Sequence, residues 1–428
     1  MSALLLAAAL SFSPSPAAAQ AAVSTRAITL PEAYALALER SEAIASDVWA
    51  TRQALARIDE LKGAILPHVS LNGTETLQEN PRSGVPSLDK TSYPQAQITL
   101  TQPLFAGLRD FLAFKQGKRQ AQSAQLTEKR AESLLYQDVA QAYVNLLQYQ
   151  DEISIRGRIV NETTARIGQL EHWVRIGRSR ESEVLAARSQ LAQTQAQVEL
   201  AKGNEAVAQE LLRFLTGVDA DFAVTPVPEP ALEPLEPFVV RAKARDDVEA
   251  QRRNLEAAQL FTTMEDRQRW PTIGLTADYY LKRFGFSTNT HYDAIVTGAL
   301  PLFMGGQINA QVKEAKAAEH QAEQALTLAE RQAEQQVNSA YRSLSWSISA
   351  VDALTKASDL AEANVKAQEQ DYRLSLVTNL DVLDSLNTLQ STELQLDAQR
   401  QLAALARAQL EVAAGGPERP STREVIKP

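Results

Sequence analysis

The chain has 428 residues, which is enough for two or three domains of ordinary size. Charged residues make up 22% of it, and the formal net charge is −9. Because this acidic balance comes without Lys/Arg clusters, it argues against a nucleic-acid partner. Cysteine is absent, which excludes disulfides, cysteine-based metal sites and thiol catalysis. The sequence also lacks a nucleophile elbow, a phosphate-binding loop and a metalloprotease motif, so we expect no enzyme activity, no cofactor and no metal.

Residues 1–19 have the features of a secretory signal peptide. The short apolar run Leu4–Leu10 is followed by Ala17–Ala19, a small-residue cleavage site before Gln20. The alternative is a disordered leader rich in alanine and proline. No other segment holds about 18 consecutive apolar residues, so no transmembrane helix is predicted. A secreted chain of this kind either stays free in the periplasm or enters a membrane as a β-barrel.

Most of the chain is a tandem duplication with a constant offset of 198 positions. The segment Gln102–Phe105 recurs as Leu300–Phe303 at this distance. We therefore divide the chain into a signal peptide (1–19), repeat 1 (20–224), a Pro-rich linker (225–237), repeat 2 (238–415) and a C-terminal tail (416–428). Three further pairs share the offset: Ala142-Tyr143 with Ala340-Tyr341, Val174-Arg175 with Tyr372-Arg373, and Glu183–Leu185 with Asp381–Leu383.

Each repeat contains one hairpin of two long strands. In repeat 1, apolar and polar residues alternate at 69–74 and again at 95–101, on either side of the Gly/Pro/Ser-rich segment Asn80–Leu88. Repeat 2 alternates in the same way at 272–282 and 294–300. Strands of roughly ten residues are long enough to cross a bilayer when tilted. The alternative is a soluble sandwich, or a short hairpin on a helical protein.

Long helices fill the rest of both repeats. Helical spacing runs from Leu30 to about Leu66, and no proline or turn cluster interrupts Gly107 to about Gly168. A continuous helix over the second stretch would be roughly 90 Å long. Alanine-rich apolar residues at steps of three and four predict coiled-coil seams. A coiled-coil rod would explain these helices but not the strands.

Four prolines are predicted to mark the junctions between helices and strands, because proline ends backbone pairing and disfavours helix at the preceding residue. They are Pro67, Pro103, Pro271 and Pro301. Pro67 and Pro271 are 204 positions apart, so six extra residues lie between Pro67 and Pro103 in repeat 1.

The strands also bear on oligomeric state. Four strands cannot close a barrel, and an open sheet edge is not tolerated in lipid, so membrane-inserted hairpins require several copies of the chain. Three copies give 12 strands, within the range of outer-membrane barrels, whereas two give eight, a number at which side chains fill the barrel interior. The second consideration favours three copies, but it is not a requirement of closure. Closure alone therefore leaves the number of copies open.

With these features the chain resembles the TolC family of outer-membrane efflux and secretion ducts. The resemblance rests on the duplicated plan, on the turns Gln102–Phe105 and Leu300–Gly306 that lead into helices, and on Tyr372–Leu389, which looks like the family's turn between its last two long helices. It implies a mixed α and β membrane protein, with four transmembrane strands per chain in a 12-stranded trimeric barrel and coiled-coil helices in a periplasmic α-barrel. The implied partners are two further copies in a homotrimer, outer-membrane lipid, a periplasmic adaptor (membrane fusion) protein and an inner-membrane pump.

The resemblance also implies a gate at the periplasmic end. Asp381 and Asp384 match the family's pore-constricting aspartates, and three-fold symmetry would turn them into two stacked carboxylate rings that favour cations. Tyr372 matches a tyrosine of the gating hydrogen-bond network, and Glu183 its acidic partner. The family's arginine falls at Val377, which leaves the network incomplete.

Arg178 or Arg180 is the candidate replacement for that arginine. The turns implied to contact the adaptor are Ile176-Gly177-Arg178 in repeat 1 and Leu374-Ser375-Leu376 in repeat 2. Ser375 stands where the family usually has glycine.

We therefore predict a passive trimeric conduit in the outer membrane, with a periplasmic domain, for efflux of small molecules by a tripartite system. One alternative is the outer-membrane component of a type I protein secretion system. The other is a periplasmic coiled-coil scaffold.

Overall fold

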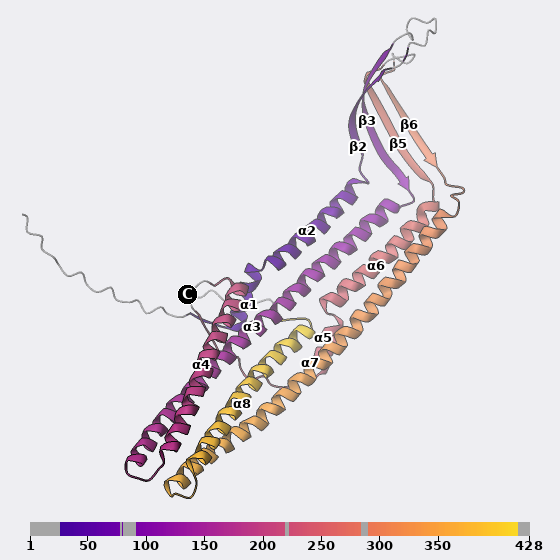
Figure 1. Ribbon diagram of the computed structural model, residues 1–428. Coiled ribbons are helices and arrows are strands. Elements are labelled where there is room, and N and C mark those ends of the chain that lie inside the picture. The colour runs from indigo at the N-terminus through magenta and orange to yellow at the C-terminus, as the bar shows by residue number, and fades with distance from the viewer. Residues whose placement is uncertain (1–25, 78, 80–90, 219–221, 284–289, 418–428) are drawn as a thin grey trace, which may run out of the picture.

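The computed structural model describes residues 26–77, 79, 91–218, 222–283 and 290–417. The molecule is elongated, with a β-sheet at one end and, at the other, the two turns that connect its long helices (Figure 1). The signal peptide expected at 1–19 and most of the tail expected at 416–428 lie outside the described residues. In chain order the elements are β1 (Arg26–Ile28), α1 (Leu30–Arg40), α2 (Glu42–Gly63), β2 (His68–Leu77), β3 (Ser92–Ala106), α3 (Arg109–Arg175), α4 (Glu181–Thr216), β4 (Phe222–Val224), α5 (Glu236–Lys243), α6 (Asp246–Asp266), the 3-10 turn η1 (Arg267–Arg269), β5 (Thr272–Lys282), β6 (Tyr292–Ala299), α7 (Gln307–Arg373) and α8 (Asn379–Ala413).

The two predicted hairpins form one antiparallel sheet in the order β2-β3-β5-β6. The central pairing of β3 with β5 joins repeat 1 to repeat 2. The register places Leu71 opposite Ile98, and Ile98 opposite Tyr279, so the apolar residues of neighbouring strands share one face. On the other face, Thr99 donates a 2.6 Å hydrogen bond to Asp278. The predicted alternation of apolar and polar residues is confirmed.

Three of the four junction prolines lie where they were expected. Pro67 precedes β2, Pro271 precedes β5, and Pro301 follows β6. The expectation for Pro103 is wrong, because β3 continues through it to Ala106. The pairing with β5 shifts register between Pro103 and Phe105. Such a bulge leaves a residue without a ladder bond, which is how a strand tolerates proline.

The long helices are longer than the sequence indicated. Helices α3 and α7 have 67 residues each, about 100 Å at 1.5 Å per residue. Helix α3 continues through Gly168 to Arg175, because a single glycine inside a helix costs only about 1 kcal/mol. Among the described residues, no helix is both long and apolar enough to span a membrane.

The stretch of helical spacing from Leu30 to about Leu66 forms two helices, α1 and α2. Ser41 has an extended backbone, and its hydroxyl accepts a 3.3 Å hydrogen bond from the Ile44 N–H. Serine is a preferred N-cap residue, so it can end α1 and start α2. Helix α2 then ends at Gly63, three residues before the expected end.

The middle of the molecule holds two separate apolar cores, one in each repeat. In repeat 1, the fully buried Tyr143 of α3 places its hydroxyl 2.8 Å from the carbonyl oxygens of Ile28 and Thr225. This contact fastens the parallel pair β1-β4 to α3. The predicted linker has no helix or strand from Thr225 to Leu235, and its last two residues belong to α5.

Candidate functional site

The sequence-predicted gate residues lie at the helical end of the molecule (Figure 1). We call α3 and α4 helical hairpin 1, and α7 and α8 helical hairpin 2. A cavity of about 920 Å³ lies between their turns and is lined by residues of both. Helix α8 also packs along α3, so the two hairpins are in contact within one subunit.

Both turns end their first helix with the same backbone pattern. In hairpin 1, the Arg178 N–H donates to the Trp173 carbonyl at 2.8 Å, and the Gly177 N–H donates to that of Val174 at 3.0 Å. In hairpin 2, the Leu376 and Ser375 N–H groups make the corresponding bonds at 2.9 and 3.0 Å. This Schellman motif needs a left-handed residue at its turning point. Gly177 (φ 75°) and Ser375 (φ 62°) take that conformation. Ser375 therefore adopts the backbone geometry usual for glycine, although its side chain disfavours this conformation.

Tyr372 and Glu183 form a direct bond between the two hairpins. The Tyr372 hydroxyl donates to the Glu183 carboxylate at 2.9 Å, and Ser179 donates to the same oxygen at 2.8 Å. Burial raises the pKa of Tyr372 above its ordinary value, and the Glu183 carboxylate raises it further. The hydroxyl therefore stays protonated and remains a donor at neutral pH. The structure thus brings together the pair that the sequence singled out.

Asp381 caps the start of its own helix. Thr378 donates to its carboxylate from the backbone N–H at 2.7 Å and from the hydroxyl at 2.6 Å, which forms a capping box at the start of α8. These hydrogen bonds hold the pKa of Asp381 below its ordinary value. Asp381 and Asp384 are both exposed, one helical turn apart.

The network contains an arginine that the sequence did not point to. Arg166 of α3 is only 6% exposed, and its Nε donates to Asn379 Oδ1 at 3.1 Å. Its guanidinium carbon lies 4.2 Å from the centre of the Tyr372 ring and 5.6 Å from that of Trp173. One signal was available: Arg166 occupies a core position of the stripe that includes Thr163, Ile167 and Leu170, where a basic residue is unexpected.

The two predicted replacements, Arg178 and Arg180, are exposed at the rim of the cavity. No hydrogen bond or ion pair in the described part of the chain joins either of them to Tyr372 or Glu183. That suggestion is therefore wrong. Their place in the turn leaves them facing solvent, whereas Arg166 reaches Tyr372 from the neighbouring helix face.

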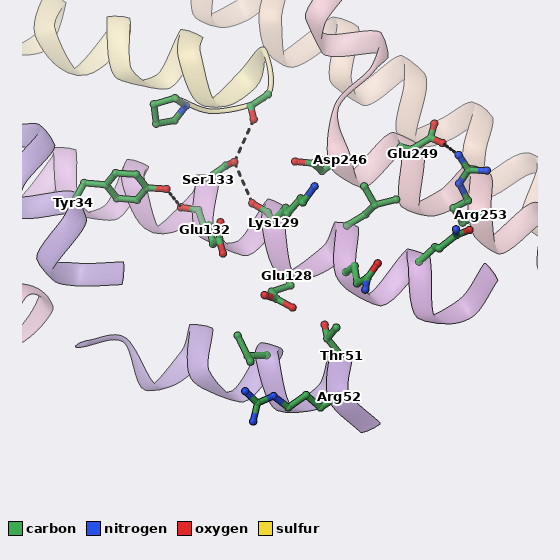
Figure 2. Close-up of a pocket in the computed structure, with 16 residues that line it drawn as sticks. Tyr34, Thr51, Arg52, Glu128, Lys129, Glu132, Ser133, Asp246, Glu249 and Arg253 are labelled. Carbon is green, nitrogen blue, oxygen red and sulfur yellow. Dashed lines mark hydrogen bonds and ion pairs between the residues drawn. The ribbon is translucent and has the colours of Figure 1, made fainter. Parts of the chain in front are cut away.

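A second cavity, of about 780 Å³, lies near the middle of the molecule, where α1, α2, α3 and α6 meet the end of α8 (Figure 2). Ser133 of α3 places its hydroxyl 3.3 Å from the Lys129 and Gly415 carbonyl oxygens, which fastens the end of α8 to α3. The cavity wall mixes both charges, for example Lys129 and Arg253 with Asp246 and Glu249. Among the described residues, no three acidic or histidine side chains are grouped to hold a metal.

A third cavity, of about 530 Å³, lies where α3 and α8 meet the linker. It holds a pair of carboxyl groups, Asp151 of α3 and Asp397 of α8, joined by a hydrogen bond. Gln401 Nε2 donates to Asp151 Oδ2 at 3.1 Å. Burial, followed by the proximity of Asp151, raises the pKa of Asp397 to about 7.

A protein-family model described as outer membrane efflux protein matches residues 33–218 and 241–416. The chain belongs to this family. The chain is 26% identical to the outer membrane protein TolC of Escherichia coli (strain K12) over 370 residues, which cover 80% of this chain and 73% of TolC. The predicted resemblance is thereby confirmed.

Solved structures of outer-membrane channels share the fold of this efflux-family chain. CusC aligns with a TM-score of 0.81 at 16% identity, covering 91% of this chain and 92% of CusC. The Neisseria gonorrhoeae channel MtrE, solved in its open state, aligns with a TM-score of 0.75 at 20% identity, covering 91% and 90%. The chain is therefore a tandem-duplicated outer-membrane export channel, not an enzyme.

Proposed function

We propose that three copies of this chain form the outer-membrane channel of a tripartite export system, a passive conduit for small molecules that is gated at its helical tips. The observation that carries the gate is the Tyr372–Glu183 hydrogen bond, which ties hairpin 1 to hairpin 2 at the end opposite the sheet. A bond of this kind can hold the tips together when made and release them when broken.

The free edges of the sheet support the trimer. Strands β2 and β6 are the outer strands, and neither has a second partner strand among the described residues. Unpaired backbone groups are not tolerated in lipid, so the edges must pair with further copies. Three copies would provide 12 strands, within the range of outer-membrane barrels, and would place the helices in a periplasmic α-barrel.

The exposed tips support docking of an adaptor. Ile176, Leu374 and Leu376 are 53%, 69% and 71% exposed, an unusual grouping of large aliphatic side chains on one end of the molecule. With Gly177, Arg178 and Ser375 they form the two turns. A periplasmic adaptor that covers these side chains would couple the conduit to an inner-membrane pump, which would supply the energy.

Asp381 and Asp384 are proposed to constrict the entrance. Both carboxylates are exposed, so neither has a buried partner that would remove it from an aqueous pore. Two rings of three carboxylates would favour cations over anions.

Membrane fractionation and planar-bilayer recording test this function. We expect the mature chain to need detergent for release and to form channels whose conductance rises in Tyr372→Phe. A hydrogen bond to a charged group contributes about 1.5–3 kcal/mol, so its loss should shift the closed-to-open ratio about tenfold or more. Tyr149→Phe, a half-buried tyrosine of α3 in the repeat 1 core, is the matched control. Release by osmotic shock alone, or equal conductance of Tyr372→Phe and wild type, would contradict the proposal.

A further inference from the structure

We infer that Arg166 is a second tie of the gate, a buried guanidinium of hairpin 1 that packs against the Trp173 and Tyr372 rings and is bound to Asn379 at the start of α8. We call this set of contacts the clamp. This inference rests on the proposed function. It adds to the closed state a residue that positions Tyr372. This residue lies on the side of α3, away from the two turns that the sequence comparison covered.

The contacts of Arg166 join three helices. Arg166 and Trp173 are both on α3, two turns apart, and the Trp173 and Tyr372 rings pack with centroids 5.2 Å apart. The guanidinium lies against both rings, and Nε reaches the fully buried Asn379, the first residue of α8. Separation of the hairpins would break the contacts to Tyr372 and Asn379 together, whereas the contact to Trp173 would remain.

The chemistry of this site differs from that of a packed core. Arg166 Nη2 is buried without a hydrogen-bond partner. The carboxylates of Glu369 and Glu183 act on the guanidinium through their charge, but neither forms a direct ion pair with it in the described residues. Burial lowers the pKa of Arg166 from its ordinary value. Burying a cation without a direct ion pair is costly, and an apolar side chain would fill the same stripe without that cost. The cation–π contacts and the Asn379 bond offset part of it. Opening would expose the guanidinium to water, which would recover its hydration energy. The clamp can therefore hold the closed state and still be released.

The duplication does not reproduce the clamp. In the other repeat, 198 residues away, the position of the arginine holds no cation, that of the tryptophan no aromatic ring and that of the asparagine no amide. Each subunit therefore has one clamp, between hairpin 1 and the start of α8. The positions that correspond to Arg166, Trp173 and Asn379 are Asn364, Asp371 and Glu181.

The test is single-channel recording of the full-length protein in planar bilayers. Arg166→Gln removes the charge and keeps a planar polar group, whereas Arg166→Lys keeps the charge and loses the planar one. Arg158→Gln is the matched control: Arg158 is on the same helix and also bonds across to α8, through a 2.9 Å ion pair with Glu393, but lies two turns farther from the tip. The thermal midpoint of each purified variant and the number of channels it inserts are measured in parallel.

We expect Arg166→Gln to raise the mean conductance at least about threefold, Arg166→Lys to raise it less, and Arg158→Gln to leave it at the wild-type value. A merely structural role for Arg166 would lower the thermal midpoint and the number of inserted channels but not change the conductance of each channel, and that result would overturn the inference. If Tyr372→Phe raises conductance and Arg166→Gln does not, the clamp is refuted while the gated channel stands. If the wild-type protein forms no channel at all, the proposed function fails and the clamp fails with it.

Discussion

We expect the contact between α3 and α8 to weaken as the pH rises through about 7, because the paired carboxyl groups of Asp151 and Asp397 hold a proton there. Burial, followed by the neighbouring Asp151, raises the pKa of Asp397 from 3.8 to about 7. Between pH 3.8 and about pH 7, the folded protein binds a proton at Asp397 that the unfolded chain has lost. The free energy of unfolding therefore falls as the pH rises from about 4 to 7, and the stabilisation is lost above the folded-state pKa. The other charged groups that face the pair are Arg158, Glu393, Arg400 and Glu229.

The size of the effect follows from the pKa. A difference of one in pKa corresponds to about 1.4 kcal/mol, so the full difference between 3.8 and about 7 would be worth about 4 kcal/mol. Asp397 is partly open to water, and screening reduces this value, so we expect ~2 kcal/mol.

The assay is the thermal midpoint of the purified protein at about pH 5.5 and about pH 8.5, where linkage predicts the lower value at the higher pH. Asp397→Asn places a neutral amide beside Asp151, so its midpoint should lose most of this pH dependence and exceed that of wild type at the higher pH. Asp359→Asn, which changes an exposed aspartate of α7, should behave as wild type. The reasoning is refuted if wild type and Asp397→Asn show the same change in midpoint between the two pH values.

Three further predictions concern the tips. Ser375→Gly should stabilise the protein by about 1 kcal/mol, measured as a higher thermal midpoint, because glycine adopts the left-handed backbone of this position without strain; a lower midpoint would contradict this. Asp381→Asn combined with Asp384→Asn should raise the conductance for anions relative to cations, and an unchanged reversal potential in a salt gradient would count against the two carboxylate rings. Leu374→Glu combined with Leu376→Glu should reduce co-purification of the adaptor several-fold without changing single-channel conductance, and full retention of the adaptor would place its contact elsewhere.

Local periodicity was enough to predict the main elements of the fold. The period of two marked all four strands of the sheet, and the steps of three and four marked the long helices, because those signals are carried by neighbouring residues. Two details of the fold have causes that periodicity does not carry. Ser41 divides a stretch of uniform helical spacing through one side-chain cap. Pro103 stays inside β3 because the register shift with β5 removes the need for its missing N–H, and that shift depends on a strand of the other repeat.

The site was predicted only where its residues are close to the turns. The Tyr372–Glu183 bond joins two positions that the family resemblance already linked, although they are 189 residues apart. Arg166 is 213 residues from Asn379 and lies on the side of a helix, so neither a turn motif nor the 198-position repeat pointed to it. Its role depends on how closely α3 and α8 pack, which the sequence pattern does not specify.

The comparison of Glu183 with Asp381 shows how the duplication became asymmetric. The two acids occupy the same repeat position, near the start of the second helix of each hairpin. Each accepts a hydrogen bond from a hydroxyl just before its helix, Ser179 or Thr378. Only Glu183 also binds Tyr372, because the repeat position of Tyr372 holds Val174 in the other copy, and a valine cannot donate to Asp381. Glu183 is thus tied to the other hairpin, whereas Asp381 closes the capping box of its own helix, α8. Opening of the proposed gate would break the Tyr372–Glu183 bond and leave that capping box intact.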